Sequence, residues 1–216
     1  MRNVFEQQLQ ELNILLLKMG TMVQEIIECS VNALINQDLE LAERIDSMDD
    51  KIDSLELIIE DKCMNLIALQ QPMAKDLRVI ATILKIITDL ERMGDHAVNI
   101  SRVTIKIGNE PFIKPLIDIP KMAKLTQEMV HSSLNAFTSR DIGLAKKIAL
   151  DDDQVDDLYE KIYTELIKKM IQDKKIVEQA TNLIFIGRYL ERIADHSTNI
   201  CERVIYMVTG ELVEIN

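Results

Sequence analysis

Acidic side chains recur in pairs along this sequence, with the two members of each pair four residues apart. That spacing places both carboxylates on one face of an α-helix. Like charges so arranged weaken a helix by about 0.2–0.5 kcal/mol per pair unless a cation neutralises them. The pairs are Asp49 and Asp53, Glu91 and Asp95, Asp152 and Asp156, and Glu191 and Asp195, and Asn99 and Asn199 extend the second and fourth.

Two neighbouring helices that each contribute such a pair would offer four acidic side chains to a metal ion. Carboxylate oxygens suit Mg²⁺, Mn²⁺ or Fe, whereas zinc usually takes His or Cys. We therefore predict that these ten residues bind divalent or trivalent metal ions (Fe, Mn or Mg), once in each half of the chain. At about 100° per residue, the face of Glu91 and Asp95 points away from the apolar seam of Leu90, so the site is expected on the bundle surface. His96 and His196 would support the ligands or face a partner.

The same residues allow two other interpretations. Acidic pairs are common on solvated helix faces, and duplication copies surface residues too, so a metal-free helical adaptor is one alternative. The other is a carboxylate-bridged dimetal enzyme of the ferritin-like kind. Glu128 and His131 have the Glu-x-x-His spacing of such enzymes, but the first half has Glu25 and Glu28 instead. The sequence also lacks GxxxxGK[ST], GxGxxG, GxSxG and HExxH motifs, and we predict that the protein is not an enzyme.

The sequence repeats itself at an offset close to 100 residues. The stretch ERMGDHAVNI, which begins at Glu91, recurs as ERIADHSTNI from Glu191, and the stretches that begin at Met19 and Met122 match at an offset of 103. This period is too long for a solenoid and suggests a duplicated bundle. We therefore divide the chain into a first repeat, residues 1–109, and a second repeat, residues 114–216.

The apolar pattern predicts the helices that must position the carboxylates. From Ile83 to Ile107, apolar residues follow alternating steps of three and four, which is typical of a bundle seam. Asp38 and Asp141 fit as helix N-caps, and Pro72 fits the first turn of a helix. The prediction is an all-α fold of two tandem, similar three-helix bundles. Its six long antiparallel helices are expected at 3–36, 39–69, 73–107, 116–139, 141–171 and 174–209.

Composition restricts the partners and the compartment. The formal net charge of −11 would repel a nucleic-acid backbone, so no nucleic-acid partner is expected. Cys29, Cys63 and Cys201 form no CxxC pair and are typical of buried residues in a reducing compartment. No run of about 18 apolar residues occurs, so we expect a cytoplasmic protein without a membrane span.

These features together resemble the PhoU family. The segments from Glu91 and Glu191 match its duplicated acidic motif, the aspartate pairs of the preceding helices match its other acidic positions, and residues 72–78, PMAKDLR, also fit. The resemblance implies two three-helix bundles with metal clusters on their acidic faces. It further implies a cytoplasmic, non-enzymatic regulator that acts negatively on high-affinity phosphate uptake and in phosphate-starvation signalling.

The resemblance also implies partners. They would be the ATPase subunit of the phosphate ABC transporter and the phosphate-sensing histidine kinase, with peripheral membrane association through the transporter and a homodimer as the assembly. One segment departs from the duplication, because residues 76–78 read DLR in the first repeat whereas residues 176–178 read IVE. A partner that contacts this segment could do so in that way only in the first repeat.

Overall fold

A computed structural model describes residues 2–215, which form six α-helices and one short 3₁₀ helix and contain no strand. The prediction of an all-α fold of six long helices is confirmed, and every boundary lies within three residues of the expected one. The helices are α1 (Arg2–Asn36), α2 (Leu39–Gln70), α3 (Lys75–Ile107), α4 (Asp118–Ser139), α5 (Ile142–Gln172) and α6 (Val177–Thr209), with η1 (Lys174–Ile176) before α6.

Two of the three local predictions about helix starts are confirmed. The Asp38 side chain accepts a hydrogen bond from Leu41 N at 2.9 Å, and Asp141 accepts one from Leu144 N at 3.0 Å, as N-caps do. The placement of Pro72 in the first turn of a helix is wrong, because α3 begins only at residue 75. Residue 71 caps α2 with a positive φ of 47°, and residue 74 has a φ of 46°, so the chain completes a turn before α3 can begin.

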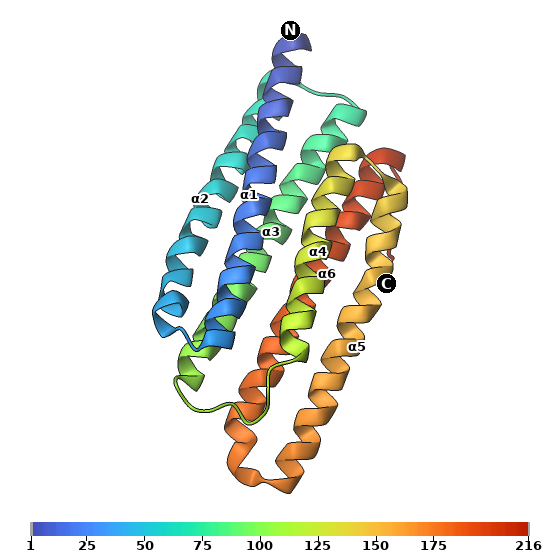
Figure 1. The fold of residues 1–216 in the computed structure, drawn as a ribbon. Helices are drawn as coiled ribbons and strands as arrows, with labels where there is room; N and C mark the ends of the chain where they lie inside the picture. The colour runs from blue at the N-terminus through green and yellow to red at the C-terminus, as the bar shows by residue number, and fades with distance from the viewer. Residues whose placement is uncertain (1, 216) are drawn as a thin grey trace.

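The helices form two antiparallel three-helix bundles that lie side by side. Figure 1 shows α1, α2 and α3 on one side of the molecule and α4, α5 and α6 on the other, with α3 and α4 in the middle. Between the repeats, α3 packs against α6 and α1 packs against α4. Within the described residues, the buried apolar side chains of both repeats belong to one continuous core.

The contact between α1 and α4 is close because a glycine lies in it. A Cβ atom built on Gly20 would lie 2.1 Å from Leu134 Cδ1, so the leucine occupies the space of the missing side chain. On α3 and α6, Ile86 and Ile186 are fully buried at equivalent positions. Burial of each such side chain contributes about 1.5–3 kcal/mol to folding, so apolar packing stabilises the two repeats as one body.

Polar side chains also join the repeats where α3 meets α6. His196 Nδ1 lies 2.9 Å from Asp89 Oδ1, and the same oxygen accepts a hydrogen bond from Asn199 Nδ2 at 3.3 Å. On the other side of this contact, the His96 ring stacks on Tyr189 with centroids 5.9 Å apart and lies 5.7 Å from the His196 ring. The two histidines therefore pack between the repeats.

The linker from Gly108 to Ile117 is held by side chains of both repeats. Gln37 Nε2 donates to Gly108 O at 2.9 Å, and Gln179 Oε1 accepts from Ile113 N at 2.7 Å. These bonds fix how the chain passes from the first bundle to the second. Among the described residues, no helix is both long and apolar enough to cross a membrane.

Candidate functional site

The acidic residues of the first repeat come from two adjacent helices, as the sequence predicts. Asp49 and Asp53 lie on α2, and Glu91 and Asp95 lie on α3. The Asp49 carboxylate lies directly over Gly94, because a Cβ atom at that glycine would come within 2.4 Å of Asp49 Oδ1. The absence of a side chain at this position therefore lets the α2 carboxylate reach the backbone of α3 between the two α3 carboxylates.

Burial and mutual repulsion change the titration of these carboxyl groups. Burial, together with the negative charges of Asp53, Asp95 and Glu91, raises the pKa of Asp49 to about 7. Burial and the Asp95 charge likewise raise the pKa values of Asp53 and Glu91 above their ordinary values. Asp49 Oδ1 is also buried and accepts no hydrogen bond from the described residues. A positive charge beside these oxygens would therefore relieve an unfavourable arrangement.

This face lies at the surface of the bundle, as expected, but it is partly covered. The helical spacing directed it away from the core, onto the open surface of the bundle. In the structure Gly94 is buried, and the side chains of Glu91 and Asp95 are only 20% and 44% exposed. Spacing on a single helix could not show that α2 packs over this face of α3. The carboxylates therefore lie at the edge of the groove between two helices.

The second repeat has equivalent acidic pairs on α5 and α6, but Ala194 occupies the position of Gly94. Asp152 is buried, and burial and the charge of Asp195 raise the pKa of Asp156. The pKa of Glu191 is also raised by burial, although an ion pair with Arg188 on the same helix opposes the shift. In the second repeat Asp156, Glu191 and Asp195 therefore lie close enough to repel one another.

Arginines beside the carboxylates already bind some of the predicted ligands. Arg92 Nη1 lies 2.9 Å from Asp95 Oδ2, and Arg192 Nη1 lies at the same distance from Asp195 Oδ2. These two arginines recur at the same place in both repeats, directly after the first glutamate of the motif, whereas Arg188 is present only in the second repeat. Thr88 occupies the equivalent position of the first repeat, so a comparison of the two repeats would have shown Arg188 as a difference between them.

The two asparagines of the predicted set lie in different surroundings. Asn199 donates to Asp89 across the contact between the repeats, which directs its amide nitrogen towards α3. Asn99 is half-buried on α3. Neither observation tests whether the asparagines bind metal, and their role as ligands stays a prediction.

The carboxylates of the described residues are neighbours without forming a complete metal cage. No three His, Cys, Asp or Glu side chains in this part of the chain are grouped closely enough to hold an ion as they stand. The donor set nevertheless fits a hard cation, because all the acidic ligands offer oxygen and Asp49 Oδ1 lacks a hydrogen-bond donor. Holding an ion would require side-chain rotations, including release of Asp95 from Arg92.

Comparison with known proteins decides the family. The model of the PhoU domain matches the chain twice, at residues 16–104 and 119–204, once within each of the two repeats. The chain belongs to the PhoU family. The PhoU crystal structure from Pseudomonas aeruginosa superposes with a TM-score of 0.91 at 36% identity, and covers 96% of this chain and 100% of that one.

Further PhoU relatives match at full length. A protein of Clostridium acetobutylicum named phosphate-specific transport system accessory protein PhoU homolog is 43% identical over 216 residues, covering 100% of this chain and 99% of its own. A protein of the same name from Aquifex aeolicus is 43% identical over 207 residues, covering 96% and 94%. The PhoU structure from Streptococcus pneumoniae has a TM-score of 0.91 at 34% identity, covering 97% and 99%. PhoU is a family of accessory proteins and not a known enzyme family.

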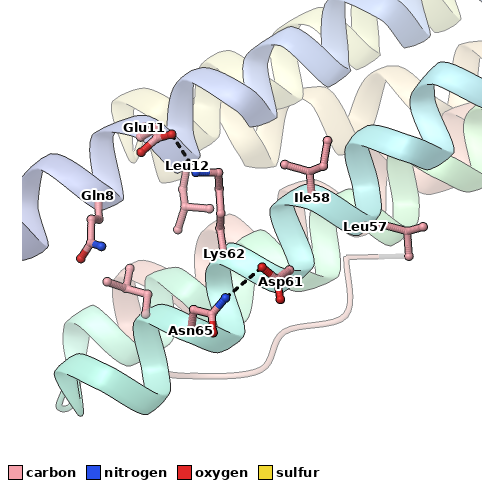
Figure 2. A pocket seen from close by; sticks show the side chains of 9 residues that line it. Gln8, Glu11, Leu12, Leu57, Ile58, Asp61, Lys62 and Asn65 are labelled. Carbon is pink, nitrogen blue, oxygen red and sulfur yellow. Dashed lines mark hydrogen bonds and ion pairs between the residues drawn. The ribbon is translucent and has the colours of Figure 1, made fainter.

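This PhoU protein also has a surface groove away from the carboxylates. It lies between α1 and α2, has a volume of about 510 Å³, and is lined by Leu12 and Leu66 with polar residues at its rim (Figure 2). Lys62 Nζ crosses the groove to Glu11 Oε1 at 2.8 Å. Because its acidic groups at Glu11 and Asp61 already pair with Lys62 and Asn65, the groove is a poor alternative to the carboxylate faces as a cation site.

Proposed function

We propose that this protein is a non-enzymatic, cytoplasmic regulator of high-affinity phosphate uptake and phosphate-starvation signalling that binds metal ions on its two acidic faces. Full-length similarity to proteins named phosphate-specific transport system accessory proteins supports the role in phosphate uptake. The observation that carries the metal-binding part is the half-buried Asp49 carboxylate, which lies among acidic neighbours and whose buried Oδ1 atom accepts no hydrogen bond from the described residues.

The residues that would hold the ions are the carboxylates of each helix pair. In the first repeat they are Asp49 and Asp53 from α2 with Glu91 and Asp95 from α3. Their equivalents in the second repeat are Asp152 and Asp156 from α5 with Glu191 and Asp195 from α6, and Asn99 and Asn199 complete the proposed set. A bound cation supplies positive charge that offsets the repulsion among these groups.

Regulation in this proposal is a change in docking. The chain carries a net charge of −11, and its acidic faces attract basic regions of partners. Filling both faces with cations changes the local charge by several units, which alters the rate and the choice of association. The proposed partners are the ATPase subunit of the phosphate transporter and the phosphate-sensing histidine kinase. Regulation is negative, the assembly is a homodimer, and membrane association is peripheral, through the transporter.

Elemental analysis of protein purified without added metal tests the metal-binding part. The variant is the double substitution Asp95→Ala and Asp195→Ala, which removes one ligand from each face. We expect wild-type protein to retain Fe, Mn or Mg, and the variant to lose most of it because two of the acidic ligands are gone. Binding of the purified ATPase subunit, measured before and after chelation, should fall in parallel with metal content.

A matched control uses two exposed carboxylates that lie at equivalent positions of the repeats. Asp50→Ala with Asp153→Ala removes the same charge from α2 and α5 without touching the proposed ligands. This control should keep the wild-type metal content. Metal near zero in the wild type would refute metal binding and favour a metal-free adaptor. Catalytic turnover that chelation abolishes would favour a dimetal enzyme.

A further inference from the structure

Four aromatic side chains occur as two neighbouring pairs, one on α5 and one on α6, the two helices that carry the second acidic face. This aromatic strip consists of Tyr159, Tyr163, Phe185 and Tyr189. The Tyr159 and Tyr163 ring centroids are 6.3 Å apart, and those of Phe185 and Tyr189 are 6.5 Å apart. Tyr163 is 41% exposed and Phe185 is 48% exposed, so both leave apolar rings in contact with water.

The fold itself does not require aromatic side chains at these positions. At the offsets that relate the repeats, the first repeat has Glu56, Glu60, Lys85 and Asp89 instead. These four residues line a hollow of about 570 Å³ between α2, α3 and α6. Because charged residues serve in the equivalent place, stability alone does not explain the exposed rings of the aromatic strip.

An arginine of the chain shows which chemistry this face accepts. The Arg188 guanidinium carbon lies 5.8 Å from the centre of the Tyr159 ring, and the same side chain forms an ion pair with Glu191. Tyr159 is held in place by Gly187, where a Cβ atom would come within 3.1 Å of the ring. An aromatic face with a carboxylate beside it is thus already used to hold a guanidinium group.

The charges around the aromatic strip favour a basic protein segment over other occupants. Four exposed acidic residues lie on α5, the helix that carries Tyr159 and Tyr163. They are Asp153, Asp156, Asp157 and Glu160. They would repel the phosphates of a nucleic acid or an anionic membrane, and they would repel the same face of a second copy. A basic segment would be attracted instead, and its apolar side chains could cover the exposed rings.

We propose that the aromatic strip of α5 and α6 is a docking surface for an arginine-bearing segment of a protein partner, whose guanidinium groups stack on Tyr163 and Phe185 and pair with neighbouring carboxylates. The proposal rests on the proposed function only in that the protein acts by docking, and it does not require bound metal. It also predicts that the partner contacts the second repeat through these rings, a contact that the first repeat cannot form in the same way.

Two fluorescent peptides of equal net charge test the proposal. One consists of arginine and leucine and the other of lysine and leucine, in the same order, and fluorescence anisotropy in physiological salt gives both affinities. We expect wild-type protein to bind the arginine peptide about five-fold more tightly, because guanidinium stacks on aromatic rings better than ammonium does. The double variant Tyr163→Ala with Phe185→Ala should bind both peptides equally.

The matched control is Glu60→Ala with Lys85→Ala, which alters the equivalent positions of the first repeat and should keep the five-fold preference. Circular dichroism verifies that both variants keep their helices. Equal affinities in the wild type, or a preference that survives loss of both rings, would overturn the proposal. It would also be overturned if the ring variant instead abolished self-association in sedimentation, or binding to anionic vesicles. Repeating the titration after chelation separates this result from the metal-binding proposal.

Discussion

The outer face of α2 and α3 and the outer face of α5 and α6 occupy equivalent positions in the two repeats, and they agree in one part and differ in another. Both have two acidic pairs and an arginine that reaches the second carboxylate of the later helix, at 2.9 Å in each case. Beyond the carboxylates, the first face has a hollow lined by charged residues and the second has the aromatic strip. The duplicated unit thus retains its acidic site while the neighbouring surfaces offer different chemistry to a partner.

Each repeat also has an ion pair at the same place, but the positions of the positive and negative residues are exchanged. In the first repeat Lys62 on α2 pairs with Glu11, and in the second Glu165 on α5 pairs with Lys114. The residues correspond at the offset of 103, but their signs are reversed. An ion pair of this kind requires opposite charges within reach, not a particular order. The acidic faces differ in this respect, because both repeats keep the same sign there.

The largest expected effect tests whether the two repeats fold as one body. Ile86→Ala and Ile186→Ala alter fully buried, equivalent positions, and each should lower the free energy of unfolding by about 2–5 kcal/mol. Because the repeats share one core, each variant should unfold in a single transition by calorimetry. The exposed Ile105→Ala serves as a control with little effect. Two transitions, with each variant shifting only one, would show that the repeats are energetically independent.

A smaller effect concerns the raised pKa of Asp49. A carboxyl group with a pKa near 7 in the folded protein binds its proton more tightly there than in the unfolded chain, so stability falls as pH rises from about 4 to 7. Asp49→Asn removes the charge, and above pH 7 it should raise the free energy of unfolding by on the order of 1 kcal/mol, after allowance for solvent screening.

Denaturant unfolding across this pH range measures the difference. The Asp49→Asn variant and the wild type should converge as pH falls below the ordinary carboxyl pKa, because the Asp49 carboxyl is then neutral in both the folded and the unfolded chain. The exposed Asp50→Asn is the control and should follow the wild type. Identical denaturant unfolding curves for Asp49→Asn and wild type at pH 8 would mean that charge repulsion at Asp49 does not destabilise the folded protein.

The smallest expected effect compares an ion pair with an apolar pair. Lys161 Nζ lies 2.9 Å from Asp118 Oδ1, and the equivalent residues of the first repeat are Ile58 and Leu15. The hydrogen bond from the lysine lowers the pKa of Asp118, so the stabilisation is present above the ordinary carboxyl pKa and disappears as pH falls through the lowered value. Lys161→Ile should therefore lower Tm by about 1–2 °C at neutral pH and have no effect in strong acid.

The double variant Asp118→Leu with Lys161→Ile rebuilds the apolar pair of the first repeat. Its Tm at neutral pH should recover towards the wild-type value, and the acid dependence due to Asp118 should be lost. Scanning calorimetry at neutral and acid pH measures both effects. A double variant that is less stable than Lys161→Ile would show that this position in the second repeat requires the ion pair.

Particular residues show how far the sequence could predict the structure. The N-caps at Asp38 and Asp141 were predictable because a side chain that bonds its own helix end acts locally. The prediction that Pro72 lies in the first turn of a helix was wrong because Gln71 and Ala74 adopt positive φ values in a turn, and no sequence pattern indicated that turn. Asp89 was not recognised because it contacts His196 and Asn199 on another helix. Arg188 and the aromatic rings have partners on their own helices, three or four residues away, but no sequence pattern singled them out.

By itself, the sequence determined the helices, the duplication and the presence of an acidic pair on each of four helices, because spacing along one helix fixes which residues share a face. Only the tertiary structure decided which way those faces point. The packing of α2 over Gly94 puts Asp49 among the α3 carboxylates, and the packing of α3 against α6 puts the histidines between the repeats. Such placements depend on how helices approach each other, which is decided by side chains distant in the sequence.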